Sequence, residues 1–196
     1  NKDNYRHQTT LNGQTTENNF KYKDITGLTR KMEHARTRHL DGRHHSQFLI
    51  RPKTLLSASL WMRSQFRELP PTLTEALSRA TQDDEFIRSV LTLQHRGKMH
   101  ILRAKAYYGY QNQEYTDPEI RLDARHRFQN AQIKLDNDWS ISPSLVLKYG
   151  IHENHFTSRS DNYNDTKTQN RLSLYSQIAW DIHPRTGITA LIRPEK

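Results

Sequence analysis

Eleven histidines are the most obvious metal-binding residues of this sequence, and four of them, His34, His39, His44 and His45, lie close together. Imidazole is a common zinc ligand, but the ligands of one ion must converge on it from neighbouring positions. In an extended strand His44 and His45 point to opposite faces, and His39 shares the face of His45. Cysteine is absent, so no thiolate site exists either. The spacing favours ordinary polar histidines, and we expect no metal site and no cofactor.

Candidate catalytic carboxylates occur at Asp83–Glu85 and at Asp136 and Asp138. The first group resembles a run of charges at the start of a strand, and the second a pair of neighbours on one strand face. The sequence contains no glycine-rich phosphate loop, nucleophile elbow or zinc helix motif. We therefore do not expect an enzyme.

Basic residues give the chain a formal net charge of +9. Several of them fall on polar strand positions: Arg63, Arg88, Arg103, Lys105, Lys134 and Lys148. They are spread over many strands, and we expect no single patch in which they alternate with aromatic side chains, as nucleic-acid recognition requires. An anionic ligand or acidic groups of the same protein are the expected partners, and no nucleic acid is expected.

The elements that carry these residues are predicted to be strands, because apolar and polar residues alternate. From Leu56 to Phe66 the even positions are mostly apolar and the odd positions mostly polar. This period of two separates apolar from polar residues on the two faces of a strand, whereas a helix would place both kinds on the same side. The pattern recurs along the chain and predicts an all-β protein of antiparallel hairpins. Tight turns are expected at Arg51–Thr54, Arg96–Lys98, Ser140–Ser144 and His183–Gly187.

Long polar connections are predicted between the hairpins, at about Glu114–Arg127 and Thr157–Asn170 and after Arg67–Pro71. Within the last of these, Thr72–Glu75 has the spacing of a capping box and predicts a short helix over Ala76–Ala80. Short turns thus lie at one end of the sheet and long connections at the other. Bacterial outer-membrane barrels show this asymmetry, with short periplasmic turns and long outer loops.

Strand length is the second indication of a membrane barrel. Strands of about ten to twelve residues, tilted by about 45°, span roughly the apolar band of about 25 Å that such barrels present to lipid. A content of 33% hydrophobic residues does not exclude a wall in which every second strand residue meets lipid, and it fits a soluble basic module or partial disorder equally well. Aromatic girdles are expected from Trp139 and Trp180 beside the short turns, and from Phe66 and Tyr110 at the opposite end. A soluble β-sandwich, with these aromatics in its core, is the alternative interpretation.

Three segments resemble the barrel wall of TonB-dependent outer-membrane receptors, in particular Bacteroidota members grouped with vitamin B12 and siderophore receptors. The segments are Glu17–Tyr22, Trp61–Pro71 and Leu174–Arg185. The first resembles an acid-Asn-Asp-Phe-x-Tyr motif, with Asn19 where the family has Asp. The others resemble a Trp-containing strand with a Leu-Pro-Pro loop and a Tyr-x-Gln-x-x-Trp strand with its turn.

The resemblance implies an antiparallel up-and-down transmembrane β-barrel of about 22 strands with a plug in its lumen. We expect about nine of those strands here, so residues 1–196 would form an incomplete part of the barrel domain, with the plug domain and the C-terminal strands outside the chain. The implied function is capture of a scarce nutrient such as cobalamin or a siderophore and its import into the periplasm. The implied partners are outer-membrane lipid and lipopolysaccharide, the plug, the TonB complex and the nutrient itself.

Candidate ligand contacts in this interpretation are side chains that face the lumen or lie in loops: Arg63, Arg103, Lys105, Tyr107, Tyr115, Tyr163 and Tyr175. Two alternatives remain at this point. One is a soluble all-β module of a secreted protein that binds carbohydrate or a polyanion. The other is a porin-like barrel without TonB coupling.

Overall fold

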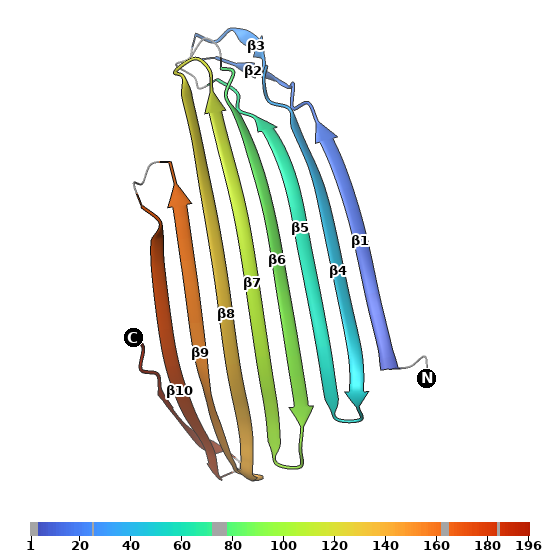
Figure 1. The fold of residues 1–196 in the computed structure, drawn as a ribbon, viewed down its shortest axis with the longest axis vertical. Helices are drawn as coiled ribbons and strands as arrows, with labels where there is room; N and C mark the ends of the chain where they lie inside the picture. Colours follow the sequence, from blue (N-terminus) through green and yellow to red (C-terminus); the bar gives the residue numbers. More distant parts are fainter. Residues whose placement is uncertain (1–3, 25, 72–77, 162–164, 184) are drawn as a thin grey trace.

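Nine strands form one antiparallel sheet in the computed structural model (Figure 1). The structure describes residues 1–196 except 1–3, 25, 72–77, 162–164 and 184. The strands are β1 (Tyr5–Thr16), β4 (Thr37–Arg51), β5 (Thr54–Glu68), β6 (Thr81–Arg96), β7 (His100–Asp117), β8 (Leu122–Ser142), β9 (Leu145–Ser160), β10 (Lys167–His183) and β11 (Thr186–Ile192). A second, two-stranded sheet of β2 (Lys21–Lys23) and β3 (Thr29–Lys31) lies in the connection between β1 and β4.

Each strand of the large sheet pairs with the next one along the chain, which is an up-and-down order. The tight turns lie where the sequence predicts them: Pro52 and Gly97, for example, lie between paired strands. These turns lie at the lower end in Figure 1, and the longer connections with β2 and β3 lie at the upper end. The predicted asymmetry and the predicted number of about nine strands are confirmed.

The strands are longer, and two connections shorter, than the sequence pattern indicated. We predicted a long loop over Glu114–Arg127, but β7 continues to Asp117 and β8 begins at Leu122. The prediction was wrong because polar residues there continue the ladder, and without an apolar face they do not show alternation. In the same way, the predicted loop Thr157–Asn170 is largely paired backbone, with β9 ending at Ser160 and β10 beginning at Lys167.

The first two residues of the helix predicted over Ala76–Ala80 lie outside the described residues, as does the whole of its capping segment Thr72–Glu75. Residues 78–80, which are described, are not helical. Over the described part of the chain, no helix is long and apolar enough to cross a membrane.

Apolar side chains of the sheet are exposed, and some polar ones are buried. Ile133 on β8 is 56% exposed and Ile178 on β10 is 48% exposed. Among the described residues the buried apolar side chains are three alanines, Ala35, Ala80 and Ala124, whereas Asp41 and Ser173 are buried. A soluble domain folds by burying large apolar side chains. This inverted distribution argues against the soluble all-β module.

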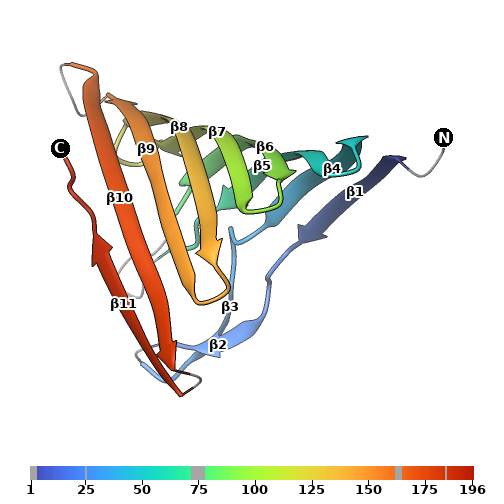
Figure 2. The same cartoon turned by 90° about the horizontal axis from the view of Figure 1, so that it is seen from below.

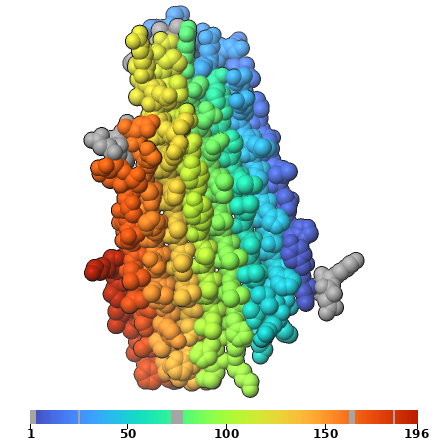
Figure 3. All heavy atoms as spheres, in the orientation of Figure 1, coloured from blue at the N-terminus to red at the C-terminus, as the bar shows by residue number. Residues whose placement is uncertain are grey.

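The polar face of the sheet is the inner side of a curve. Seen from below, the sheet curls round from β1 to β11 (Figure 2), and its strands pack side by side as one continuous layer (Figure 3). One hollow is lined by polar-face side chains of β7, β8, β9 and β10 together with Leu191 of β11. Along most of β8 the polar-face side chains are less exposed than the apolar-face side chains, as expected where side chains on the inner side of a curved sheet crowd together. The apolar side chains therefore occupy the convex side.

Candidate functional site

A groove of about 550 Å³ lies on the concave face across β7–β11. It contains three of the residues that the sequence predicted as ligand contacts, namely Lys105, Tyr107 and Tyr175. The other residues of its lining are mostly polar: Asn130, Gln132, Lys134, His152, Ser173, Leu191 and Arg193. We call it the β7–β11 groove. Its cationic and hydrogen-bonding lining suits a polar or anionic ligand.

Tyr175 is held in this groove by residues of neighbouring strands. Its hydroxyl donates a hydrogen bond to Asp136, and Lys134 forms an ion pair with the same carboxylate at 3.2 Å. The Lys134 ammonium also lies 5.3 Å from the centre of the Tyr175 ring, within cation–π range. Between Tyr175 and Asp136 in the sheet stands Gly150, which pairs with both. The absence of a side chain at Gly150 lets the tyrosine reach across β9.

Arg103 lies beside the groove and is engaged by a carboxylate. Its Nη2 donates to Asp138 Oδ2 at 2.7 Å, and both side chains are partly buried. The prediction that Asp136 and Asp138 are polar-face neighbours near a turn is confirmed by these contacts. Because its charge is already paired, Arg103 is a weaker ligand candidate than Lys105, for which the described residues show no ion pair.

A second set of polar-face residues lies on β4, β5 and β6, and we call it the arginine–aromatic cluster. It consists of Asp41, Arg43, Trp61, Arg63, Phe86 and Arg88. The register places them in two adjacent rows of three, Asp41–Arg63–Phe86 and Arg43–Trp61–Arg88. One predicted contact, Arg63, belongs to this cluster and is thus separated from the β7–β11 groove.

Asp41 is the centre of the cluster and is only 4% exposed. Its carboxylate accepts hydrogen bonds from Trp61 Nε1 at 2.7 Å and Arg63 Nε at 3.1 Å. Arg43 Nε donates to the other carboxylate oxygen at 3.1 Å. A buried carboxylate requires such partners, and here they fix three side chains at once.

Two aromatic rings of the cluster contact the guanidinium groups. Trp61 and Phe86 meet edge to face with ring centres 4.7 Å apart. The Arg88 guanidinium lies 4.6 Å from the centre of Phe86 and 5.2 Å from that of Trp61, while Arg43 lies 4.8 Å from Trp61. These distances are within the range of cation–π attraction.

The expectation that basic residues form no patch alternating with aromatics was therefore wrong. The signal was present in the sequence as three pairs of residues two apart: Asp41 and Arg43, Trp61 and Arg63, Phe86 and Arg88. Each pair shares a strand face. What the sequence does not contain is the register that aligns the three pairs.

The remaining predicted contacts lie elsewhere. Tyr115 is near the loop end of β7, where its hydroxyl donates to Asp117 at 3.2 Å. Tyr163 lies outside the described residues. The register places Tyr115 opposite Gln82 and Ala124, towards the loop end and away from the groove and the cluster.

The four predicted girdle residues all lie on the apolar face. Trp139 and Trp180 are near the short turns, and Trp139 stacks on His100 with ring centres 5.5 Å apart. Phe66 lies at the opposite end, under the guanidinium of Arg38 at 4.8 Å. Tyr110 lies further from a strand end than expected, because β7 continues to Asp117.

The histidine-rich segment is divided as predicted. His39 and His45 lie on the polar face of β4, whereas His44 lies on the apolar face and contacts Thr9 and His7 of β1. His34 precedes the strand and contacts the carbonyl oxygen of Ala80 at 2.8 Å. Among the described residues, no group of three or more histidines and carboxylates is placed to hold a metal ion.

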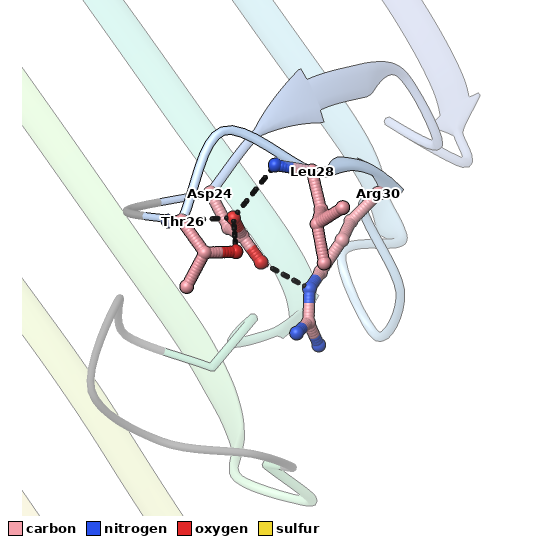
Figure 4. Close-up of polar contacts among 4 residues, drawn as sticks. All are labelled: Asp24, Thr26, Leu28 and Arg30. Carbon is pink, nitrogen blue, oxygen red and sulfur yellow. Dashed lines mark hydrogen bonds and ion pairs between the residues drawn. The ribbon is translucent and has the colours of Figure 1, made fainter.

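The turn between β2 and β3, at the loop end, is built around Asp24 (Figure 4). Asp24 Oδ1 accepts hydrogen bonds from the Thr26 hydroxyl at 2.6 Å and from the backbone N–H groups of Thr26 and Leu28. Arg30 Nε donates to Oδ2 at 2.6 Å. The Thr26 hydroxyl bond, followed by Arg30 and the backbone donors, lowers the pKa of Asp24 to about 2.

Taken together, the fold defines a class: an up-and-down antiparallel sheet with an apolar convex face and a polar concave face, matching part of an outer-membrane transporter barrel. The outer-membrane transporter YddB from Escherichia coli matches over 98% of this chain with a TM-score of 0.64 at 10% identity. The copper transporter OprC matches over 95% with a TM-score of 0.52 at 11% identity. Both are transporters rather than enzymes by their names.

At these identities the likeness concerns the fold. The chain spans 32% of the length of YddB and 39% of that of OprC. No protein-family model and no curated protein sequence matches the chain.

Proposed function

We propose that this chain is part of the barrel wall of a TonB-dependent outer-membrane receptor that binds a scarce nutrient and imports it into the periplasm. The observation that carries the proposal is the sheet itself, with exposed apolar side chains on its convex face and a concave polar face. The likeness of 98% of the chain to part of the barrel of YddB supports it.

The finer assignment rests on the sequence resemblance. The segments Glu17–Tyr22, Trp61–Pro71 and Leu174–Arg185 resemble Bacteroidota receptors grouped with those for cobalamin and siderophores. In this proposal the convex face meets outer-membrane lipid and lipopolysaccharide, and the concave face surrounds a plug domain of the same protein. Coupling to the TonB complex would come through residues outside this chain.

The β7–β11 groove is the proposed place where the wall contacts the nutrient. Lys105, Tyr107 and Tyr175 would bind it through charge and hydrogen bonds, and the protein would carry out no bond chemistry. Arg63, Arg103 and Tyr115 would hold wall and plug together or contact the nutrient from other positions.

Expression of the whole protein in a Gram-negative host tests the proposal. We expect it in the outer-membrane fraction, with a mobility in SDS gels that changes on heating, and we expect uptake of labelled cobalamin or ferric siderophore that stops when TonB is removed. The double variant Lys105→Gln/Tyr175→Phe tests the groove in the same assay. It should reach the outer membrane as the wild type does and bind less nutrient. Recovery of the whole protein as a soluble, folded monomer would contradict the proposal.

A further inference from the structure

A second hollow lies beside the arginine–aromatic cluster, on the concave face of β1, β4, β5, β6 and β7. Its volume is about 550 Å³. The polar-face side chains that line it are Gln8, Thr10, Arg43, His45, Ser59, Trp61, Arg88, Val90 and Tyr107. We call it the β1–β7 hollow. Tyr107 lines both this hollow and the β7–β11 groove, so the two are neighbours.

The β1–β7 hollow carries an excess of positive charge. None of the described residues in its lining is acidic. The cluster has three guanidinium groups and the single carboxylate of Asp41, which binds Arg43 and Arg63, so positive charges exceed negative ones by two. Arg88 contacts the rings of Trp61 and Phe86, and among the described residues no carboxylate lies within ion-pair distance of it. An arginine in this setting still offers its donors to an anion.

The cationic groups are also held in place before any ligand arrives. Asp41 is buried and fixes Arg43 and the indole of Trp61 through its hydrogen bonds. Gly109, opposite Arg88 in the register, leaves room for the Tyr107 ring, whose hydroxyl would collide with a side chain there. Fixed donors and ring walls lose little conformational entropy on binding.

We propose that the β1–β7 hollow binds a ligand through a carboxylate or phosphate group, which would lie between Arg43 and Arg88. Guanidinium groups bind both kinds of oxyanion through paired hydrogen bonds, and Trp61 and Tyr107 supply flat walls for the rest of the ligand. This inference deepens the proposed function, on which it rests: it assigns to the lumen wall a second contact region, selective for anions.

Calorimetric titration of the whole protein, purified from outer membranes in detergent, with citrate and with pyrophosphate tests the inference. We expect at least one of the two to bind at low salt, and glycerol not to bind. The double variant Arg43→Gln/Arg88→Gln should weaken binding by about tenfold or more, because two charge-assisted contacts are removed. Comparison of citrate with pyrophosphate distinguishes a carboxylate from a phosphate preference.

Arg125→Gln is the control for loss of a distant positive charge, since it removes one at the Glu114 ion pair near the loop end. It should leave binding within about twofold of the wild type, because exposed charges so far apart are screened. The inference fails if neither anion binds the folded wild-type protein, which is the result expected if an acidic segment of the plug occupies the hollow. It also fails if the double variant binds the anion as tightly as the wild type does. A protein absent from the outer membrane would instead contradict the proposed function.

Discussion

Glycine beneath a tyrosine ring is a repeated device at the scale of single residues on the concave face. Tyr107 leans over Gly109 on its own strand, and Tyr175 leans over Gly150 on the neighbouring strand. A β-carbon built on either glycine would collide with the ring. Each ring covers a glycine that would otherwise weaken the strand, and the Tyr175 hydroxyl is also held by its hydrogen bond to Asp136.

Gly150→Ala should destabilise the protein. The new β-carbon would lie 2.7 Å from Tyr175 Cε1 and 2.8 Å from Asp136 Oδ1, and it would also collide with backbone. Overpacking of this kind costs about 1–3 kcal/mol. Urea unfolding of the whole protein in lipid measures the change. Gly97→Ala is the control, because the nearest atom to its β-carbon would be at 3.5 Å, an ordinary contact; equal stability of the two variants would refute the prediction.

The pKa of Asp24 leads to a prediction about the turn between β2 and β3. A carboxylate pKa lowered from 3.8 to about 2 means that its ionised form favours the folded turn. That stabilisation is complete above the ordinary value and is lost as the pH falls from about 4 towards 2. Thr26→Val removes the largest cause, so the pKa of Asp24 should rise towards its ordinary value.

Carboxyl NMR shifts of the selectively labelled whole protein follow this titration. Thr29→Val serves as the control, because no bond from Thr29 to the Asp24 carboxylate occurs among the described residues, and it should leave the pKa unchanged. An unchanged titration in Thr26→Val would show that Arg30 and the backbone donors suffice.

At the scale of elements, two neighbouring strands supply partners to a polar residue on the apolar face, Asn137. Asn137 has apolar-face parity on β8 but is only 6% exposed. Its amide donates to the Tyr149 hydroxyl of β9 at 2.7 Å, and its Nδ2 lies 3.2 Å from Nδ1 of His100 on β7. Backbone and side-chain polar groups that face lipid must be satisfied within the protein. The three strands therefore hold the amide nitrogen of Asn137, whereas its carbonyl oxygen is buried without a hydrogen-bond partner among the described residues.

Arginine substitutions at neighbouring positions of β8 test which face meets lipid. Leu135→Arg, near the middle of the apolar stretch, should cost about 2–4 kcal/mol if that face contacts the bilayer. Gln132→Arg places the same side chain on the concave face, where water is available, and should cost much less. Stability in lipid vesicles with urea gives both values. Equal costs, or a larger one for Gln132→Arg, would exclude the proposed orientation.

Turn positions could be predicted from the sequence because their residues have intrinsic backbone preferences, as Pro52 and Gly97 do. The strands, and the sheet face on which each of their side chains lies, could be predicted wherever one face is apolar. The extension of β7 and β8 could not, because beyond Asn112 most residues of the hairpin are polar on both faces and no clear period of two remains. Hydrogen bonding of the backbone ladder, which side-chain pattern does not report, maintains those strands.

The candidate site could be predicted only in part. Lys105, Tyr107 and Tyr175 follow from strand parity, and the structure brings them together in one groove. The arginine–aromatic cluster depends on the pairing of β4, β5 and β6, since a slip of one residue would turn its members to the other face. Register is a property of the assembled sheet, so the sequence pattern alone did not indicate the cluster.

At the scale of the whole molecule, the apolar band drifts along the strands from β5 to β9. On β5 it covers Leu56–Met62, and on β9 it covers Leu145–Ile151. A row here means the residues that the backbone pairing aligns side by side from β5 through β6, β7 and β8 to β9. Ile151 lies in the same row as Leu56, and Thr157 lies in the same row as Met62. The drift of six residues corresponds to about 20 Å along a strand, over about 19 Å of sheet width. A level apolar band thus requires strands tilted by about 45°, near the tilt of membrane barrels.

This tilt predicts the depth of individual positions in a bilayer. Single-cysteine spin labels at Leu56 and Ile151 should differ in depth by about 14 Å although they share a row, because the row crosses the bilayer obliquely. Labels at Met62 and Ile151 should lie at nearly the same depth, although they are six residues apart in register. The absence of cysteine from the chain leaves these labels without competition within it.

Power-saturation electron paramagnetic resonance of the whole protein in vesicles, with oxygen and a nickel chelate as relaxing agents, measures these depths. A label at Gln132 on the concave face is the control. It should be accessible to the nickel chelate or shielded by protein, and its accessibility to oxygen should not reach the high value typical of the bilayer centre. Equal depths at Leu56 and Ile151 would mean that the rows lie parallel to the membrane, which a tilted barrel does not permit. Because the tilt follows from the register and the apolar residues, that result would overturn the barrel interpretation irrespective of the nutrient.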